Sequence, residues 1–184
     1  MSGKLIFYFG TVNSSKSMML LAIGHNYDSC GWKVCAIKPD LDTRSELIET
    51  RAKVPPRKAN IIVSAKDSLY DYYDIINECD VILVDECQFL TESHINELRN
   101  ISSDRNIDVL CFGLRTDFNT KLFPASKRLF ELADEINEVK TICNVCGKKA
   151  GFNAKLSLTD NCSNIEPGWD NFEQRCWKCY SRKE

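Results

Sequence analysis

The sequence predicts an α/β fold in which a mostly parallel sheet is flanked by helices. Short apolar runs recur at residues 4–9, 33–37, 60–63, 81–84 and 107–112, and helix-like stretches separate several of them. The run Val81-Ile82-Leu83-Val84 is apolar at every position, as strands are when helices cover both faces of a sheet. From Asn137 onward the alternation stops and paired cysteines begin. We therefore expect an α/β domain over residues 1–140 and a smaller domain over residues 141–184.

Helices are expected between the strands. The candidate segments are residues 15–29, ended by Gly31, and residues 68–78, 91–100 and 126–133. The basic segment 51–58, which contains Pro55-Pro56, is predicted to be an exposed loop with solvated charges. His25 and His94 fall in helix-like stretches that we expect at the surface, and neither has a partner pattern for a nucleophilic triad. No chemistry is assigned to them.

Composition narrows the class of protein. A chain of 184 residues with 43% hydrophobic content is long enough for one full core and a small appendage. The net charge of −2 and the pI near 5.8 argue against a nucleic-acid partner, which normally requires a basic face. The longest apolar runs fall well short of the roughly 20 residues that span a membrane. Ten cysteines without a secretory signal predict reduced thiols or bound metal in a cytoplasmic protein.

A loop of small residues follows the first predicted strand and precedes the first predicted helix. It consists of Gly10, Thr11, Val12, Asn13, Ser14, Ser15, Lys16 and Ser17. Backbone N–H groups and the helix dipole converge at such a corner and favour phosphate, with Lys16 neutralising the terminal phosphates and Ser17 holding Mg²⁺. Ser15 stands where the pattern has glycine, at a cost of about 1–2 kcal/mol if it is left-handed. The alternative is an ordinary corner with a surface lysine.

Two acidic residues come directly after the apolar run 81–84. Because the carboxyl ends of parallel strands meet at one edge of a sheet, we expect Asp85 and Glu86 beside the phosphate loop. Asp85 would share the magnesium with Ser17, and Glu86 would accept a proton from an attacking hydroxyl. The alternative is an acidic pair that only caps the next turn.

Two Cys-x-x-Cys pairs predict a zinc site. Cys143 and Cys146 are separated by 29 residues from Cys176 and Cys179. Four thiolates complete a tetrahedral zinc site with no open position, so its role is structural, and zinc binding can fold so short a segment. The stretch between the pairs carries Phe152, Trp169 and Phe172. It is either a clamped loop that closes over a planar ligand or a zinc ribbon with an insertion.

The order of these motifs resembles that of the type II thymidine kinases over nearly the whole chain. The motifs are the phosphate loop, Lys38-Pro39 with Asp42-Thr43-Arg44, Asp85-Glu86-Cys87-Gln88-Phe89, Gly113-Leu114-Arg115-Thr116-Asp117-Phe118, the segment 129–136 and the four cysteines. The resemblance implies ATP-dependent phosphorylation of the 5′-hydroxyl of thymidine. It also implies a P-loop α/β domain, a zinc-ribbon domain with a lasso-like substrate loop, and a homotetramer.

The resemblance also implies roles for individual residues. Glu86 corresponds to the catalytic base, and Arg44 to a residue near the transferred phosphate. ATP contacts are implied for residues 10–17 and for Asp85, Glu86, Cys87 and Gln88, and magnesium support for Ser17, Asp42 and Asp85. The implied nucleoside contacts are Val12, Arg44, Gln88, Phe89, Leu114, Phe118 and Phe123, with Phe152, Asn153 and Phe172 on the zinc-clamped loop.

Three positions depart from the family pattern. Ser15 replaces glycine in the phosphate loop, Phe172 replaces tyrosine, and Val12 replaces methionine on the base side. These changes bear on ATP affinity and on nucleoside selectivity. The alternative function is a nucleotide-dependent regulatory or binding protein of the same fold that lacks kinase activity.

Overall fold

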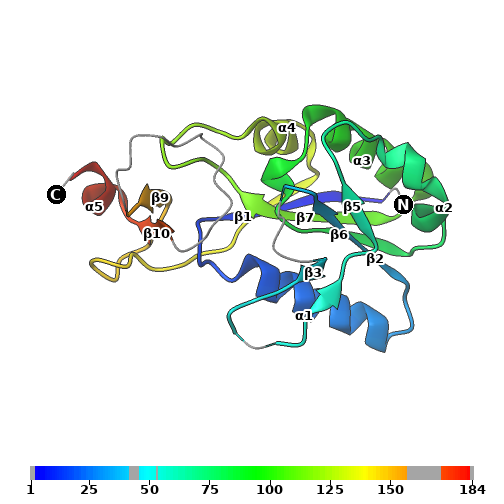
Figure 1. The fold of residues 1–184 in the computed structure, drawn as a ribbon, viewed down its shortest axis with the longest axis horizontal. Helices are drawn as coiled ribbons and strands as arrows, with labels where there is room; N and C mark the ends of the chain where they lie inside the picture. Colours follow the sequence, from blue (N-terminus) through cyan, green and yellow to red (C-terminus); the bar gives the residue numbers. More distant parts are fainter. Residues whose placement is uncertain (1–2, 42–45, 53, 157–170, 183–184) are drawn as a thin grey trace.

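The structure is a computed structural model that describes residues 3–41, 46–52, 54–156 and 171–182. Within these residues, six strands form one parallel sheet in the order β5-β2-β6-β7-β1-β8 (Figure 1). The strands are β1 (Leu5–Gly10), β2 (Val34–Pro39), β5 (Ile61–Val63), β6 (Val81–Val84), β7 (Asp108–Leu114) and β8 (Glu135–Glu138). The predicted α/β fold is confirmed, and all five predicted apolar runs contain a strand.

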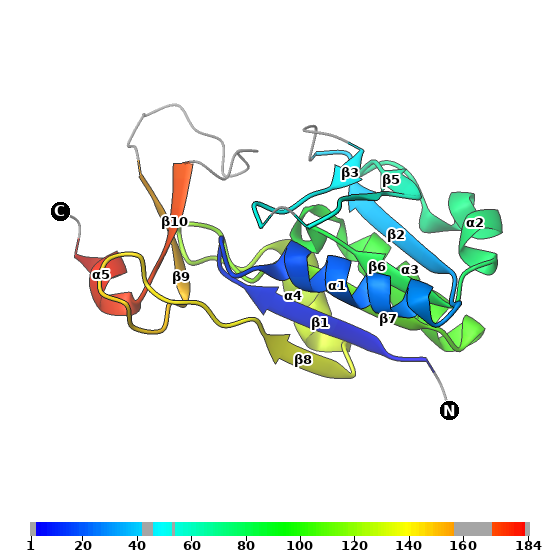
Figure 2. The same cartoon turned by 90° about the horizontal axis from the view of Figure 1, so that it is seen from below.

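Helices cover both faces of the sheet. Helix α1 lies on one face, whereas α3 and α4 lie on the other (Figures 1 and 2). Leu5 and Phe7 of β1 pack on the α3 and α4 side, whereas Ile6 packs with Leu20 and Leu21 of α1. This alternation explains why the strands are apolar on both faces. The helices are α1 (Lys16–Ser29), α2 (Tyr73–Asn77), α3 (Glu92–Arg105) and α4 (Pro124–Leu132), with the 3₁₀ helices η1 (Leu69–Tyr72) and η2 (Cys87–Phe89).

Each segment predicted to be helical contains a helix, but the ends of the helices differ from the predicted ones. The segment expected as one helix over residues 68–78 divides into η1 and α2, and α3 continues past residue 100 to Arg105. His94 is only 1% exposed, so the expectation that it lies at the surface was wrong. Its ring accepts a hydrogen bond from Thr91 N, while Thr91 Oγ1 accepts from His94 N, and its Nε2 lies 2.9 Å from Asp67 O. These contacts cap the start of α3 and tie it to a neighbouring loop.

The basic segment 51–58 is not simply an exposed loop. Strand β4 (Arg57–Lys58) pairs antiparallel with β3 (Leu47–Ile48). Arg57 also forms an ion pair with Asp28 of α1, so its charge is not merely solvated. The pattern missed the strand pairing because β4 has only two residues, and it missed the ion pair because Asp28 is 29 residues away in sequence.

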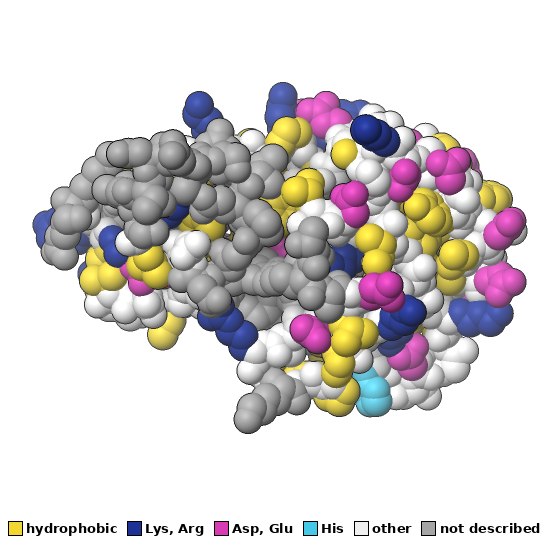
Figure 3. Space-filling view, in the orientation of Figure 1, with side chains coloured by type: hydrophobic (Ala, Val, Ile, Leu, Met, Phe, Trp, Pro, Cys, Tyr) yellow, Lys and Arg dark blue, Asp and Glu magenta, His cyan; other side chains and the backbone are white. Residues whose placement is uncertain are grey.

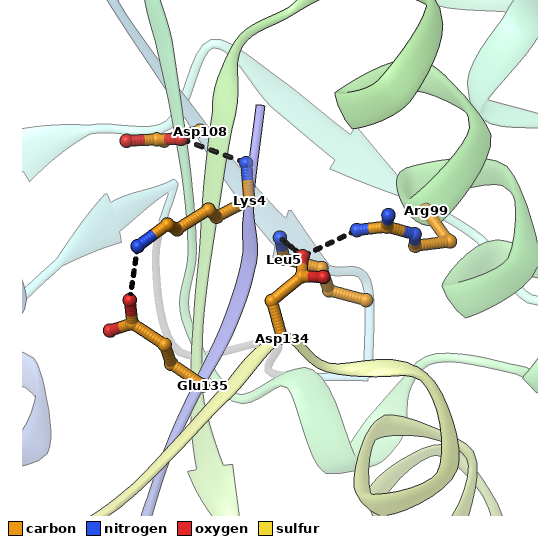
Figure 4. A network of polar contacts seen from close by, with 6 residues as sticks. All are labelled: Lys4, Leu5, Arg99, Asp108, Asp134 and Glu135. Carbon is orange, nitrogen blue, oxygen red and sulfur yellow. Dashed lines mark hydrogen bonds and ion pairs between the residues drawn. The ribbon is translucent and has the colours of Figure 1, made fainter. Parts of the chain in front are cut away.

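Strand β8 was missed by the sequence pattern. It is a polar strand at the edge of the sheet, so it shows no apolar run, and it pairs with β1. Figure 4 shows the polar network that holds it at the base of β1. Asp134 Oδ2 accepts from Leu5 N at 2.8 Å and from Arg99 Nη1 at 2.5 Å, while Lys4 Nζ pairs with Glu135 at 2.5 Å. The parallel sheet therefore extends almost to residue 140.

Replacing Asp134 by alanine is expected to destabilise the protein by about 1–3 kcal/mol, because the buried Leu5 amide loses its acceptor. Urea unfolding followed by circular dichroism measures this free energy. The matched control is Glu135→Gln, which breaks a half-exposed ion pair with Lys4 and should change stability by less than about 1 kcal/mol. Equal effects of the two substitutions would contradict the role assigned to Asp134.

The C-terminal lobe lies at one end of the molecule, beyond the carboxyl end of β1 (Figures 1 and 2). It contains the antiparallel pair β9 (Phe152–Lys155) and β10 (Phe172–Arg175), followed by α5 (Trp177–Ser181). Figure 3 shows acidic and basic side chains interspersed over the visible face of the α/β domain. In the part of the chain that the structure describes, we find no helix with the length and apolar character needed to cross a membrane.

Candidate active site and metal centre

The phosphate loop links β1 to α1 and is partly left-handed. Asn13 and Ser15 have φ angles of 56° and 65°, as a loop that normally carries glycine requires. Each such non-glycine conformation costs about 1–2 kcal/mol unless other contacts hold it. Gly10 is required where it stands, because an added Cβ would lie 2.3 Å from Ser14 Oγ and 2.8 Å from Val139 O. Ser15, which stands where the phosphate-loop pattern has glycine, therefore adopts the left-handed conformation that glycine would adopt, directly before α1.

Lys16 lies inside this loop and is only 6% exposed. Its Nζ donates to Thr11 O at 2.8 Å and to Ser14 Oγ at 3.4 Å. Burial lowers the pKa of Lys16, and the negative charges of Glu86 and Asp85 oppose that effect. A phosphate bound at the loop would strengthen the charged form further. The alternative of a surface lysine is excluded by this burial.

Ser17 and Asp85 form the expected pair at the carboxyl edge of the sheet. Ser17 Oγ donates to the two carboxylate oxygens of Asp85 at 3.1 and 3.2 Å. A hydroxyl and a carboxylate are hard oxygen ligands of the kind that Mg²⁺ prefers, so this pair fits the ion. Asp42, the third residue predicted to support magnesium, lies outside the described residues, as does Arg44.

Glu86 is held by a hydrogen-bonded glutamine. It is 4% exposed and left-handed, with φ 49°. Gln88 Nε2 donates to Glu86 Oε2 at 2.7 Å, and Gln88 Oε1 accepts from Leu114 N at 2.9 Å. The Gln88 amide therefore uses both its donor and its acceptor. It links the carboxylate of Glu86 to the backbone of Leu114 at the end of β7, and this link fixes the direction of the carboxylate. Backbone strain of this kind is common where a side chain must be aimed at a reacting group.

Gly113 leaves the space that Gln88 occupies. A Cβ at this position would lie 2.5 Å from Cys87 Sγ and 2.6 Å from Gln88 Oε1. Gly113→Ala is therefore expected to displace Gln88 and, with it, the carboxylate of Glu86. We expect kcat for the phosphoryl transfer that the resemblance implies to fall by up to about 100-fold, since catalytic groups tolerate little misplacement. The control is Gly151→Ala, where an added Cβ meets no atom within 4 Å. Steady-state kinetics measure both, and an unchanged kcat for Gly113→Ala would contradict this arrangement.

Four of the residues predicted on the nucleoside side form two aromatic pairs, and the others lie elsewhere. Phe89 and Phe123 pack edge to face with ring centres 6.0 Å apart, and Phe118 and Phe172 lie 5.9 Å apart. Leu114 ends β7, and Val12 is buried in the phosphate loop. Phe152 instead packs on Trp177 and Tyr180 of α5, with ring centres 5.1 and 5.5 Å away. Trp169 lies outside the described residues.

Several contacts of this region have no sequence signal. Tyr180 Oη donates to Phe118 O at 2.6 Å, and Arg115 Nη2 donates to Gly151 O at 3.1 Å. Asn153, predicted to contact the nucleoside, uses its side-chain amide to bind the backbone at Val12 and Thr116. All four hydrogen bonds join the C-terminal lobe to the α/β domain. A local pattern cannot reveal them because their partners are more than 35 residues apart.

The four predicted cysteines converge on one point. The Sγ atoms of Cys143, Cys146, Cys176 and Cys179 all lie within 4.8 Å of one another. Cys146 Sγ and Cys176 Sγ are 3.6 Å apart, close to the roughly 3.8 Å expected for two sulfurs of a tetrahedral site with Zn–S bonds of about 2.3 Å. The cluster therefore fits zinc. The interpretation as unrelated thiols is excluded.

Backbone turns prepare these thiols for metal. Gly147 N donates to Cys143 O at 2.9 Å, and Cys179 N donates to Cys176 O at 3.1 Å. Burial raises the pKa of Cys143, but backbone hydrogen bonds at Cys176, Cys146 and Val145 outweigh it and lower the pKa to about 6. A hydrogen bond with Cys146 and burial raise the pKa of Cys179 to about 12. The environment therefore favours the thiolate at Cys143 but not at every ligand, and zinc, which binds the thiolate form, would release the remaining protons on binding.

Comparisons with known proteins agree with this geometry. A family model described as thymidine kinase matches residues 3–180. The thymidine kinase of Streptococcus agalactiae serotype Ia is 36% identical over 148 residues, which cover 80% of this chain and 78% of that protein. The thymidine kinase of Enterobacteria phage T4 is 38% identical over 155 residues, which cover 83% of this chain and 80% of that protein.

Solved structures share the fold. A replication initiator DnaA bound to AMPPCP and single-stranded DNA superposes with a TM-score of 0.50 at 20% identity, covering 75% of this chain and 40% of that one. The flagellar accessory protein FlaH from Methanocaldococcus jannaschii gives a TM-score of 0.50 at 11% identity, covering 80% of this chain and 75% of that one. At these identities the similarity extends to the fold alone.

Proposed function

We propose that this chain, which belongs to the thymidine kinase family, transfers the γ-phosphate of ATP to the 5′-hydroxyl of thymidine at the edge of the sheet where Lys16 and Glu86 meet. The observation that carries the proposal is the pair of hydrogen bonds from Ser17, the neighbour of the buried Lys16, to Asp85, the neighbour of the buried Glu86. One group able to hold phosphate and one able to accept a proton therefore share a site. This pairing is what phosphoryl transfer to an alcohol requires.

The phosphate loop is the proposed ATP site. Its backbone N–H groups and Lys16 bind the phosphates, with further contacts at Asp85, Glu86, Cys87 and Gln88. Ser17 and Asp85, together with Asp42, hold the magnesium that accompanies ATP. When bound, this ion supplies neutralisation of the charge on the phosphates. The hydrogen bonds between Ser17 and Asp85 place the two side chains close enough to bind the same magnesium ion, which supports this assignment.

Glu86 is the proposed general base. It accepts the proton of the 5′-hydroxyl as that oxygen forms a bond to the γ-phosphorus, while the bond from the γ-phosphorus to the bridging oxygen breaks and ADP leaves. Gln88 supports this role because it donates to one carboxylate oxygen of Glu86 while its own carbonyl oxygen is held by Leu114 N of β7, so that the carboxylate has a fixed direction. Base catalysis of this kind contributes about 10²–10⁴-fold to the rate.

The nucleoside is proposed to lie beside the aromatic side chains near the ends of β7 and β10. The Phe118–Phe172 contact supports a planar ligand there. Arg44 is proposed to contact the transferred phosphate. The remaining proposed contacts are Val12, Gln88, Phe89, Leu114, Phe123, Phe152 and Asn153.

Further properties belong to the same proposal. The α/β domain is taken as residues 1–140 and the zinc domain as residues 141–184, with one structural zinc per chain supported by the cysteine cluster. The family resemblance supports a homotetramer. Metal-ligating Cys-x-x-Cys pairs support a reducing, cytoplasmic location.

A phosphoryl-transfer assay tests the proposed function. The protein is incubated with γ-labelled ATP, magnesium and a panel of thymidine, deoxyuridine, deoxycytidine and adenosine. Labelled thymidine monophosphate is expected, and a reaction without nucleoside controls for ATP hydrolysis. ATP binding without any labelled nucleotide product would favour the alternative of a nucleotide-dependent binding protein.

A further inference from the structure

Asn153 connects the C-terminal lobe to the phosphate loop. It lies on β9 and is buried, with 4% of the residue exposed. Its Oδ1 accepts from Val12 N at 2.9 Å, and its Nδ2 donates to Thr116 O at 2.9 Å. A buried amide that satisfies two backbone groups on separate segments holds both in place, because removing it leaves each without a partner. One of these segments is the loop proposed to bind ATP.

Gln174 makes a second connection to the same loop. It lies on β10 directly opposite Asn153 in the antiparallel pair. Its Oε1 accepts from Asn13 Nδ2 at 3.0 Å. Two neighbouring residues of the C-terminal lobe therefore hold two consecutive residues of the phosphate loop.

The zinc cluster fixes the strand pair that carries these two residues. Gln174 O accepts from Asn144 N at 3.0 Å, and Asn144 lies between the ligands Cys143 and Cys146. Cys176 follows Gln174 by two residues. A change in the cluster therefore reaches Gln174 through one hydrogen bond and one short segment of backbone.

Val12 and Asn13, the loop residues that bind Asn153 and Gln174, lie at or beside positions with a left-handed backbone. Asn13 has φ 56°, and Ser15 has φ 65° in place of a glycine. Residues in this conformation persist when surrounding contacts determine it. The hydrogen bonds from the C-terminal lobe can therefore stabilise the left-handed conformation of a phosphate loop in which serine replaces glycine.

We propose that Asn153 and Gln174 are positioning residues that form a clamp, through which the zinc site keeps the phosphate loop in its ATP-binding conformation. The inference rests on the proposed function for the identity of ATP as the ligand. It extends that function by assigning the zinc site an effect on ATP affinity in addition to local folding.

The first test measures the dissociation constant of a non-hydrolysable ATP analogue without nucleoside. Asn153→Ala is expected to weaken binding about tenfold, and Gln174→Leu about threefold, while zinc content stays at one per chain. Gln174→Glu retains the acceptor for Asn13 and should restore binding to within twofold of the wild type. The matched control is Tyr180→Phe, which removes the hydrogen bond from Tyr180 Oη to Phe118 O, a contact between the lobe and the α/β domain that does not reach the phosphate loop.

The second test combines zinc removal with the clamp variants. Chelation is expected to weaken analogue binding at least about tenfold in the wild type. In the double variant Asn153→Ala/Gln174→Leu, chelation should change binding less than twofold, because the connection is already broken. Circular dichroism of each variant establishes that the α/β domain is folded.

The outcomes separate this proposal from the proposed function. Equal analogue affinities for Asn153→Ala and Tyr180→Phe, or an equal effect of chelation in the wild type and the double variant, would overturn the clamp. If the clamp variants weaken analogue binding but the wild type phosphorylates no nucleoside, the clamp stands and the proposed function fails. If the wild type phosphorylates thymidine while Asn153→Ala binds the analogue normally, only the clamp fails.

Discussion

Replacing Glu86 by glutamine is expected to lower kcat for thymidine phosphorylation at least about 100-fold while ATP affinity changes little. The amide of glutamine has nearly the shape of the carboxylate and can still accept the hydrogen bond from Gln88 Nε2. It cannot take a proton from an attacking hydroxyl. The loss should therefore appear in kcat and not in the dissociation constant for ATP.

Single-turnover kinetics with saturating ATP and thymidine measure this effect directly. The matched control is Glu92→Gln, which changes an exposed acid in the first turn of α3 and should leave kcat within twofold. A variant with wild-type kcat would exclude Glu86 as the base.

Removing zinc is expected to unfold the C-terminal lobe while the parallel sheet stays intact. The described residues of the lobe form a short strand pair, one short helix and a small aromatic cluster of Phe152, Trp177 and Tyr180. So little buried surface cannot offset the entropy of ordering the segment without a metal. A four-thiolate zinc site contributes about 10–16 kcal/mol in small zinc domains, which is enough to decide whether the lobe is folded.

Hydrogen exchange before and after chelation measures this change segment by segment. Amides of β9 and β10 should lose protection, whereas those of β1, β6 and β7 should keep it. Cys179→Ser provides a genetic equivalent, and Cys30→Ser, at an exposed cysteine outside the cluster, is its control. Zinc-free protein with fully protected β9 and β10 amides would defeat the prediction.

These two predictions depend on groups that local sequence patterns had already indicated. The phosphate loop, the acidic pair after β6 and the two Cys-x-x-Cys pairs each occupy a few consecutive residues. Their chemistry follows from backbone geometry and ligand spacing over that short range. The apolar runs of the central strands are equally local, because a strand covered on both faces must be apolar at successive positions.

Other features depend on partners far away in the sequence. Strand β8 is polar, and it belongs to the sheet because β1 offers an open edge and Asp134 accepts from Leu5. His94 is buried because a loop carbonyl at Asp67 lies against its ring. Neither placement has a signal in the neighbouring residues, since the contacts that stabilise them form only when the chain is folded.

The same distinction applies to the site. Residue types at fixed spacing were sufficient to identify the phosphate-binding corner, the proposed base and the zinc ligands. The parallel topology also predicted that Asp85 and Glu86 lie beside the phosphate loop. The sequence pattern did not reveal the contacts that hold these groups: Gln88 joins Glu86 to the end of β7, and Asn153 joins the zinc lobe to Val12 across 141 residues of sequence. Hydrogen bonds at such separations depend on how whole elements pack, so they became visible only in three dimensions.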